Sequence, residues 1–156
     1  MPPDPNGKHA AIAERRVLAI LVTYRRPREL AIALDRLRRS DPRPDRLVVF
    51  DNAPTPENRS AVEGIGDDDD PWVEYQPMPA NLGPAGARAA GMSRLLESAD
   101  DSDLIVLLDD DDPLPDGGLL GALCERVDAL ERSDPHFGGL ALRGGLAGYV
   151  LRSFHR

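Results

Sequence analysis

The feature of this sequence that most constrains its fold is an apolar run that ends in four consecutive aspartates. Leu104–Leu108 (LIVLL) has the length and unbroken apolar character of a strand buried on both faces of a sheet, and Asp109–Asp112 follow it directly. Such a strand needs helices against both of its faces, which is the arrangement of an α/β domain. Carboxylates at the end of a rigid strand suit Mg²⁺ or Mn²⁺, which prefer oxygen ligands. An acidic turn that caps the next helix is the alternative interpretation.

The rest of the chain alternates between strand and helix patterns. Further buried strands are predicted at Val17–Val22 (VLAILV) and Leu47–Phe50 (LVVF), with a shorter one at Val73–Gln76. Strand–helix alternation with wholly apolar strands predicts a mostly parallel sheet with helices on both faces. The other expected elements are helices over Arg28–Arg39, Asn58–Ile65, the stretch from the glycine loop Asn81–Gly86 to Ser98, and Gly117–Glu131, a loop at Asp67–Asp70, and a poorly defined fifth strand around Gly139–Leu142.

Polar residues follow the ends of three of these strands. Thr23 and Tyr24 follow the first strand, together with Arg25 and Arg26, while Asp51 and Asn52 follow the second. Ligands of parallel α/β sheets bind beyond the carboxyl ends of the strands, so these residues and the aspartate run are expected at one edge of the sheet. Contact with a nucleotide and ordinary surface or capping roles are both open for each group. The Asn81–Gly86 loop opens a helix, whose N-terminus favours anions.

Composition excludes several other classes of function. The formal net charge of −8 is opposite to that of a general nucleic-acid binder, so no nucleic-acid partner is expected. The single cysteine, Cys124, allows no internal disulfide and is interpreted as a small core residue in a reducing compartment. Residues 1–16 are polar and are predicted to be a disordered tail. No apolar run approaches the roughly 20 residues that span a bilayer, so a cytoplasmic protein is expected, at most peripheral at a membrane.

Four segments, taken in order, resemble glycosyltransferase family 2, and in particular its rhamnosyl- and galactofuranosyl-transferase-like members. They are VLAILVTYRRPRELAIALDRL, PDRLVVFDNAPT, NLGPAGARAAGM and LIVLLDDDDPLPD, which together run from Val17 to Asp116. The resemblance implies the GT-A fold, a Rossmann-like nucleotide-diphospho-sugar transferase type. It also implies Mg²⁺- or Mn²⁺-dependent, inverting transfer of a sugar from a UDP- or dTDP-sugar. The implied acceptor is a hydroxyl of a glycan, a lipid-linked molecule or a small molecule.

The same resemblance implies roles for individual residues. Asp109 and Asp111 occupy the ends of the family's DxD motif, with Asp111 the direct metal ligand, while Asp110 would touch the ribose or sugar. Asp51 would contact the base or ribose. Arg88 would replace a polar donor contact, because Ala89 stands where relatives often carry asparagine. The full implied donor-binding set is Thr23, Tyr24, Arg25, Asp51, Asn52, Asn81, Gly83, Gly86, Arg88, Asp109 and Asp110.

The family places its general base and acceptor-binding region well downstream of the DxD motif, whereas this sequence ends at Arg156. Residues 17–156 are therefore expected to form a single nucleotide-sugar-binding domain, apparently truncated, and no general base is identified. The glycine-rich stretch after Phe137 predicts an open edge that an oligomer or a partner chain covers. Two functions stay open, namely a glycosyltransferase and a non-catalytic nucleotide-sugar-binding or interaction module.

Overall fold

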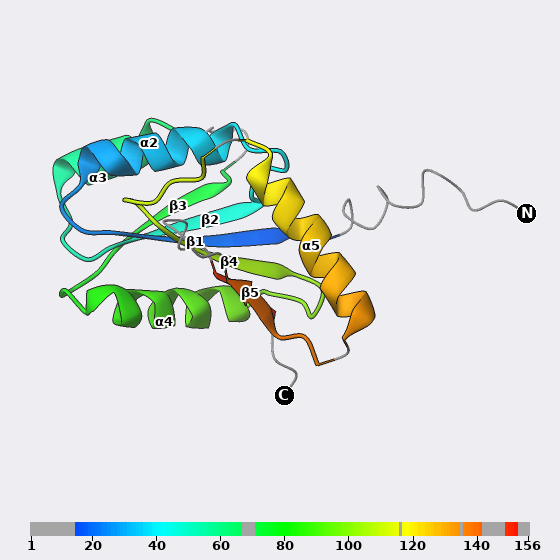
Figure 1. The fold of residues 1–156 in the computed structure, drawn as a ribbon. Helices are drawn as coiled ribbons and strands as arrows, with labels where there is room; N and C mark the ends of the chain where they lie inside the picture. Colours follow the sequence, from blue (N-terminus) through cyan, green and yellow to red (C-terminus); the bar gives the residue numbers. More distant parts are fainter. Residues whose placement is uncertain (1–14, 67–70, 116, 135, 142–148, 153–156) are drawn as a thin grey trace, which may run out of the picture.

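A computed structural model describes residues 15–66, 71–115, 117–134, 136–141 and 149–152 of the chain (Figure 1). The expected loop at Asp67–Asp70 lies outside these residues, as does nearly all of the tail 1–16. Most predicted bounds differ from the observed ones by no more than two residues. The elements are β1 (Val17–Thr23), α2 (Pro27–Arg38), β2 (Arg46–Asp51), α3 (Pro56–Glu63), β3 (Val73–Pro77), α4 (Gly83–Leu96), β4 (Leu104–Asp109), α5 (Leu119–Ser133), β5 (Gly139–Ala141) and β6 (Tyr149–Arg152).

The strands of the described residues form one six-stranded sheet in the order β3-β2-β1-β4-β6-β5. The strands β3, β2, β1 and β4 run parallel, whereas β6 is antiparallel to β4 and β5 is antiparallel to β6. The α/β class with a mostly parallel sheet is therefore confirmed. The sequence predicted a strand at β5 but not its antiparallel partner β6.

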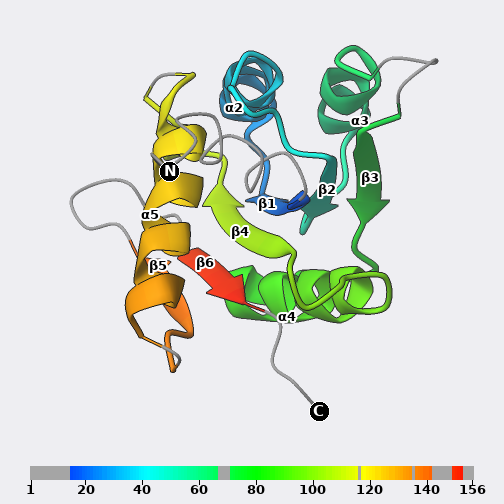
Figure 2. The ribbon, with the colours of Figure 1, turned by 90° about the vertical axis from the view of Figure 1, so that its right-hand side faces the viewer.

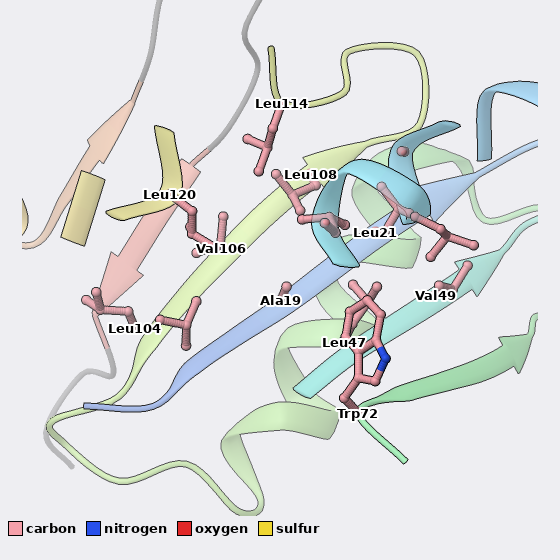
Figure 3. Packing of buried hydrophobic residues seen from close by; sticks show 14 of the residues in the cluster. Ala19, Leu21, Leu47, Val49, Trp72, Leu104, Val106, Leu108, Leu114 and Leu120 are labelled. Carbon is pink, nitrogen blue, oxygen red and sulfur yellow. The ribbon is translucent and has the colours of Figure 1, made fainter. Parts of the chain in front are cut away.

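Helices cover both faces of the sheet, as the pattern of the strands requires. Figures 1 and 2 show α2 and α3 over one face and α4 over the opposite face. Alternate residues of β1 belong to two separate apolar clusters: Ala19 and Leu21 pack with α2, α3 and α5, whereas Ile20 and Val22 pack with α4. Figure 3 shows the larger cluster, on the face under α2, with Trp72 beside Leu47. A period of two along each strand thus separates the two faces.

The helix α2 shows why the apolar pattern places a helix there. Leu30, Ala33, Leu34 and Leu37 are its buried residues, and their spacing puts them on one face of an α-helix. Pro27 occupies the first turn, where its missing N–H costs nothing. None of the helices in the described part of the chain is long and apolar enough to cross a membrane.

The helix α4 differs from the prediction at its start and lies unusually close to the sheet. It begins at Gly83, so most of the expected Asn81–Gly86 loop is its first turn rather than a loop. Gly83 itself adopts a φ of +68°, which a residue with a side chain rarely adopts. At Gly91 an added Cβ would lie 2.8 Å from Cγ2 of Ile20 and 3.1 Å from Cε2 of Phe50. The absence of a side chain at Gly91 therefore lets α4 approach the backbone of the sheet.

Candidate functional site

A cleft opens at the carboxyl ends of β1 and β4, beside the N-terminus of α4. Its volume is about 390 Å³. This is the edge at which a parallel α/β sheet is expected to bind ligands. Its lining residues are Val22, Thr23, Tyr24, Arg26, Asn52, Asn81, Gly83, Pro84, Arg88, Asp109, Asp110 and Asp111. The structure therefore brings part of the predicted set together in the cleft, namely Thr23, Tyr24, Arg26, Asn52 and Asp109–Asp111.

Asp109, the last residue of β4, lies on the α4 side of the sheet. The alternation of β4 explains this placement, because Ile105 and Leu107 pack with α4 and Asp109 follows them at the same spacing. Arg88 of α4 meets this carboxylate with Nη2, which lies 2.6 Å from Oδ1 and also contacts Oδ2. The Nε–H of Arg88 is buried and meets no acceptor among the described residues. An unmet buried donor costs about 1–3 kcal/mol, so this pairing leaves Arg88 incompletely satisfied.

Asp110 turns inward and is one of the few buried carboxylates of the described chain, with 3% of its surface exposed. The hydroxyl of Thr23 donates a hydrogen bond of 2.6 Å to its Oδ2, and Nη1 of Arg26 lies 3.3 Å from its Oδ1. Burial raises the pKa of Asp110, while the hydrogen bond from Thr23 and the charge of Arg26 act in the opposite direction. Thr23 thus holds the middle aspartate in place from the end of β1.

Asp111 is the most accessible of the three aspartates that line the cleft. About half of its side chain is exposed (53%), and its Oδ2 is in contact with Nη1 of Arg26. Arg26 therefore bridges Asp110 and Asp111, and the hydrogen bond to Asp111 is the main cause that raises the pKa of the guanidinium. Between them, Arg26 and Arg88 place a guanidinium group against every aspartate that lines the cleft.

The two asparagines of the cleft both contact the start of α4, and Asn52 joins it to the end of β2. The side-chain amide of Asn52 donates to the carbonyl of Gly83 at 3.1 Å, and its Oδ1 accepts from the N–H of Leu82 at 3.3 Å. Oδ1 of Asn81 accepts from the N–H of Gly83 at 2.9 Å. These contacts fix the first turn of α4 beside the cleft, so the glycine segment is held by the sheet.

Three residues of the predicted donor-binding set do not line the cleft. Asp51 is fully buried on the α3 side, where it accepts hydrogen bonds from Asn58 Nδ2 (2.8 Å), Tyr75 Oη (2.7 Å) and the N–H of Ala53 (2.9 Å). Leu47, Val49 and Asp51 are alternate residues of β2 and therefore point to the same face of the sheet. Leu47 and Val49 pack with α2 and α3, so the side chain of Asp51 points to that face and away from the cleft.

Arg25 and Gly86 are the other two. Arg25 has a positive φ of 55°, and its guanidinium lies 5.2 Å from the ring centroid of Tyr24. Of the two arginines that follow β1, Arg26 and not Arg25 therefore lines the cleft. Gly86 lies within α4, where an added Cβ would lie 2.6 Å from Cβ of Leu82. The absence of a side chain at Gly86 therefore makes room for the side chain of Leu82.

The chemistry of the cleft fits a hard divalent cation that is shared with a phosphate ligand. Asp109 and Asp111 supply carboxylate oxygens, which Mg²⁺ and Mn²⁺ prefer, and Asp111 is exposed to the cleft. Mg²⁺ is commonly held by one or two carboxylates together with substrate phosphates and water. Among the described residues there is no group of three or more His, Cys, Asp or Glu side chains that could hold a metal ion.

The sequence model of the family described as glycosyl transferase family 2 matches residues 18–137. The chain belongs to glycosyl transferase family 2. The match includes every residue that lines the cleft, from Val22 to Asp111. The family membership that the four sequence segments suggested is thereby confirmed.

Two curated relatives of the family 2 chain carry the same name. It is 36% identical over 128 residues to the galactofuranosyltransferase GlfT1 of Mycolicibacterium smegmatis, an alignment that covers 76% of this chain and 38% of that protein. It is 37% identical over 115 residues to galactofuranosyltransferase GlfT1 of Mycobacterium tuberculosis, covering 69% of this chain and 34% of the relative. The chain thus spans little more than a third of the length of these relatives.

Solved structures with a similar fold are also glycosyltransferases. A mannosyltransferase from Pyrobaculum calidifontis, in complex with GDP-Man and Mn²⁺, aligns with a TM-score of 0.61 at 24% identity, over 82% of this chain and 35% of that one. Glucosyl-3-phosphoglycerate synthase from Mycobacterium tuberculosis aligns with a TM-score of 0.57 at 16% identity, over 97% and 62% of the two chains. The GT-A fold predicted for this family 2 chain is confirmed.

Proposed function

We propose that the cleft binds the diphosphate of a nucleotide-sugar donor together with a divalent cation held by Asp111 and Asp109. The observation that carries this proposal is the grouping of Asp109–Asp111 with Arg26 and Arg88 at the carboxyl ends of β1 and β4. The carboxylates suit a cation, the guanidinium groups suit phosphate oxygens, and the N-terminus of α4 favours an anion beside them. The family 2 membership of the chain supports the same substrate class.

The proposed roles follow from how each side chain is held. Asp110 is buried and tied to Thr23, so it orients the two aspartates on either side of it. Tyr24 is 42% exposed at the cleft, where it offers a ring face to the nucleoside. Asn52 holds the first turn of α4, which shapes the floor beneath the donor. A divalent cation bound here would supply Lewis-acid stabilisation of the leaving diphosphate.

Inverting transfer to an acceptor hydroxyl is the reaction we propose for the whole protein. In this reaction a carboxylate deprotonates the acceptor hydroxyl as it attacks the anomeric carbon from the face opposite the diphosphate. We propose a UDP- or dTDP-sugar as the donor and a glycan, lipid-linked or small hydroxyl as the acceptor. The names of the galactofuranosyltransferase relatives support the sugar-transfer activity. The Mn²⁺ in the mannosyltransferase of similar fold supports Mn²⁺ or Mg²⁺ as the cation.

A non-catalytic nucleotide-sugar-binding module is the second candidate. Among the described residues, the carboxylates that line the cleft are Asp109, Asp110 and Asp111. All three are assigned to the donor side, so none is left to act as the general base. Under this alternative the chain binds the donor without transferring its sugar. The edge strand β5 is where we expect a further segment or a partner chain to add to the sheet.

Calorimetric titration of UDP and of dTDP, each with and without Mn²⁺, tests the donor site. We expect binding that requires Mn²⁺ and that weakens at least about tenfold in Asp111→Asn, because a metal ligand is lost. Asp100→Asn is the matched control, since Asp100 precedes the opposite end of β4 and is highly exposed (81%). Equal affinity of both variants for UDP and Mn²⁺ would refute the assignment of Asp111.

Release of UDP or of free sugar from a UDP-sugar separates the two candidates. Turnover by the chain alone supports the enzyme, whereas tight binding without any release supports the binding module. Absence of nucleotide binding under every condition would overturn both.

A further inference from the structure

The two arginines of the cleft are already bound to the carboxylates that the proposed cation needs. Arg88 contacts both oxygens of Asp109, and Arg26 contacts Asp110 and Asp111. These are contacts within one small cleft, made from α4 on one side and from the segment after β1 on the other. The guanidinium groups therefore lie against the carboxylate oxygens that would hold the proposed cation.

We propose that Arg26 and Arg88 are exchangeable counterions that make cation binding depend on the nucleotide diphosphate. This inference rests on the proposed donor site and adds a coupling to it. On arrival of the diphosphate, the guanidinium groups transfer from the carboxylates to the phosphate oxygens. The released oxygens of Asp109 and Asp111 then coordinate the cation. No covalent bond changes in this exchange, and the partners of four charged groups are rearranged.

The electrostatics of the cleft favour this order of events. A divalent cation that enters alone has to displace two guanidinium groups, which then lie close to it without an anionic partner and repel it. A diphosphate that enters with the cation offers each guanidinium two phosphate oxygens, which the planar guanidinium group can bind in bidentate fashion. The repulsion is thereby replaced by an attraction, so each ligand improves the binding of the other.

The exposure of the four side chains supports an exchange that needs no change of fold. The Arg88 and Asp109 side chains are 25% and 22% exposed, which makes their pairing stronger than that of a surface pair. Arg26 and Asp111 are 46% and 53% exposed, so both can change rotamer freely. The buried Nε–H of Arg88 has no acceptor among the described residues. A phosphate oxygen could accept from it, which would favour a different position of the guanidinium when a phosphate is present.

The experiment measures the affinity for Mn²⁺ alone and in the presence of saturating UDP, by the electron paramagnetic resonance signal of free Mn²⁺. Coupling is the ratio of the two dissociation constants, and by linkage it equals the effect of Mn²⁺ on UDP affinity. For the native chain we expect a coupling of about tenfold or more, which corresponds to about 1.4 kcal/mol. In Arg88→Gln we expect Mn²⁺ alone to bind at least about threefold tighter, UDP to bind more weakly, and the coupling to fall toward unity.

Two further variants keep the result interpretable. Arg26→Gln removes the second, more exposed counterion and should change the three quantities in the same directions. Arg94→Gln is the matched control, because Arg94 lies on the same helix α4 but pairs with Glu74 and Glu97 outside the cleft. It makes the same change of charge and should leave Mn²⁺ binding unaltered.

The outcomes distinguish this inference from the proposed function. If UDP and Mn²⁺ bind to the native chain but both cleft variants bind Mn²⁺ alone no better than Arg94→Gln does, the counterion exchange is refuted and the donor site stands. If Arg94→Gln tightens Mn²⁺ binding as much as they do, the effect is one of net charge and the exchange is again refuted. If the native chain binds neither UDP nor Mn²⁺, the proposed function itself fails.

Discussion

Replacing Thr23 by valine should destabilise the chain by removing the hydroxyl that donates a hydrogen bond to the buried Asp110 carboxylate. The Oγ1–Oδ2 distance is 2.6 Å, Thr23 is 1% exposed and Asp110 is 3% exposed, so water does not replace the lost donor. Hydrogen bonds to charged groups contribute about 1.5–3 kcal/mol, and valine has nearly the shape of threonine. We therefore expect the free energy of unfolding to fall by about 2 kcal/mol.

Urea unfolding followed by circular dichroism measures this change, with a double-mutant cycle to isolate the interaction. In the Asp110→Asn background the same replacement removes a hydrogen bond between neutral groups, which contributes about 0.5–1.5 kcal/mol. The penalty for Thr23→Val should therefore be smaller there by about 1 kcal/mol. Equal penalties in the two backgrounds, or a penalty under about 0.5 kcal/mol in the native chain, would refute the assignment of Thr23 as the anchor of Asp110.

Two other buried groups give predictions that do not depend on a ligand. Asp51 accepts three hydrogen bonds, and Asp51→Asn puts an amide opposite the donors of Asn58 and Tyr75. The urea midpoint should therefore fall by an amount equivalent to about 1–3 kcal/mol in the free energy of unfolding. An unchanged midpoint would contradict the contacts described. Burial raises the pKa of the Cys124 thiol from 9.0 to about 11. Between these pH values the thiol loses its proton in the unfolded chain but keeps it in the folded chain, so the stabilisation from the buried thiol is complete below pH 9 and is lost as the pH rises to about 11. Between pH 9 and about 11 the free energy of unfolding of the native chain should therefore fall by about 2–3 kcal/mol relative to that of Cys124→Ala. The same pH dependence in both proteins would show that the thiol is not buried.

The strands of the parallel sheet could be predicted because each is a short apolar run that has to be buried on both faces. The alternation of side chains along each strand also predicts the face to which its last side chain points. Alternation from Leu107 places Asp109 on the α4 side, within reach of Arg88, and alternation from Val49 turns Asp51 to the α3 side. The sequence predicted the convergence on one edge of the sheet. The different directions of Asp109 and Asp51 follow only when the period of two is continued to the last residue of each strand.

Other features depend on tertiary contacts that no local pattern contains. The start of α4 at Gly83 is stabilised by Asn52 and Asn81, and the first of these lies far away in the sequence. The choice of Arg26 over Arg25 follows from a backbone turn with positive φ at a residue that is not glycine. The strand β6 pairs antiparallel with β4 across a long separation in the chain, and its sequence is too short and too mixed to predict a strand.

Gly91 lies on the face of α4 that meets the sheet, outside the cleft, and still influences where Arg88 lies. Arg88 lies just under one turn before Gly91 on α4, and the same helix carries the first turn that Asn52 ties to the sheet. A methyl group at position 91 would lie 2.8 Å from Cγ2 of Ile20 and 3.1 Å from Cε2 of Phe50, which is too close without a shift. We expect α4 to move outward from the sheet and to carry the guanidinium of Arg88 away from Asp109. If the cleft binds a nucleotide as we propose, a screen for weakened nucleotide affinity would recover Gly91, although it does not line the cleft. The absence of a side chain at this position determines how close α4, and with it one wall of the cleft, lies to the sheet.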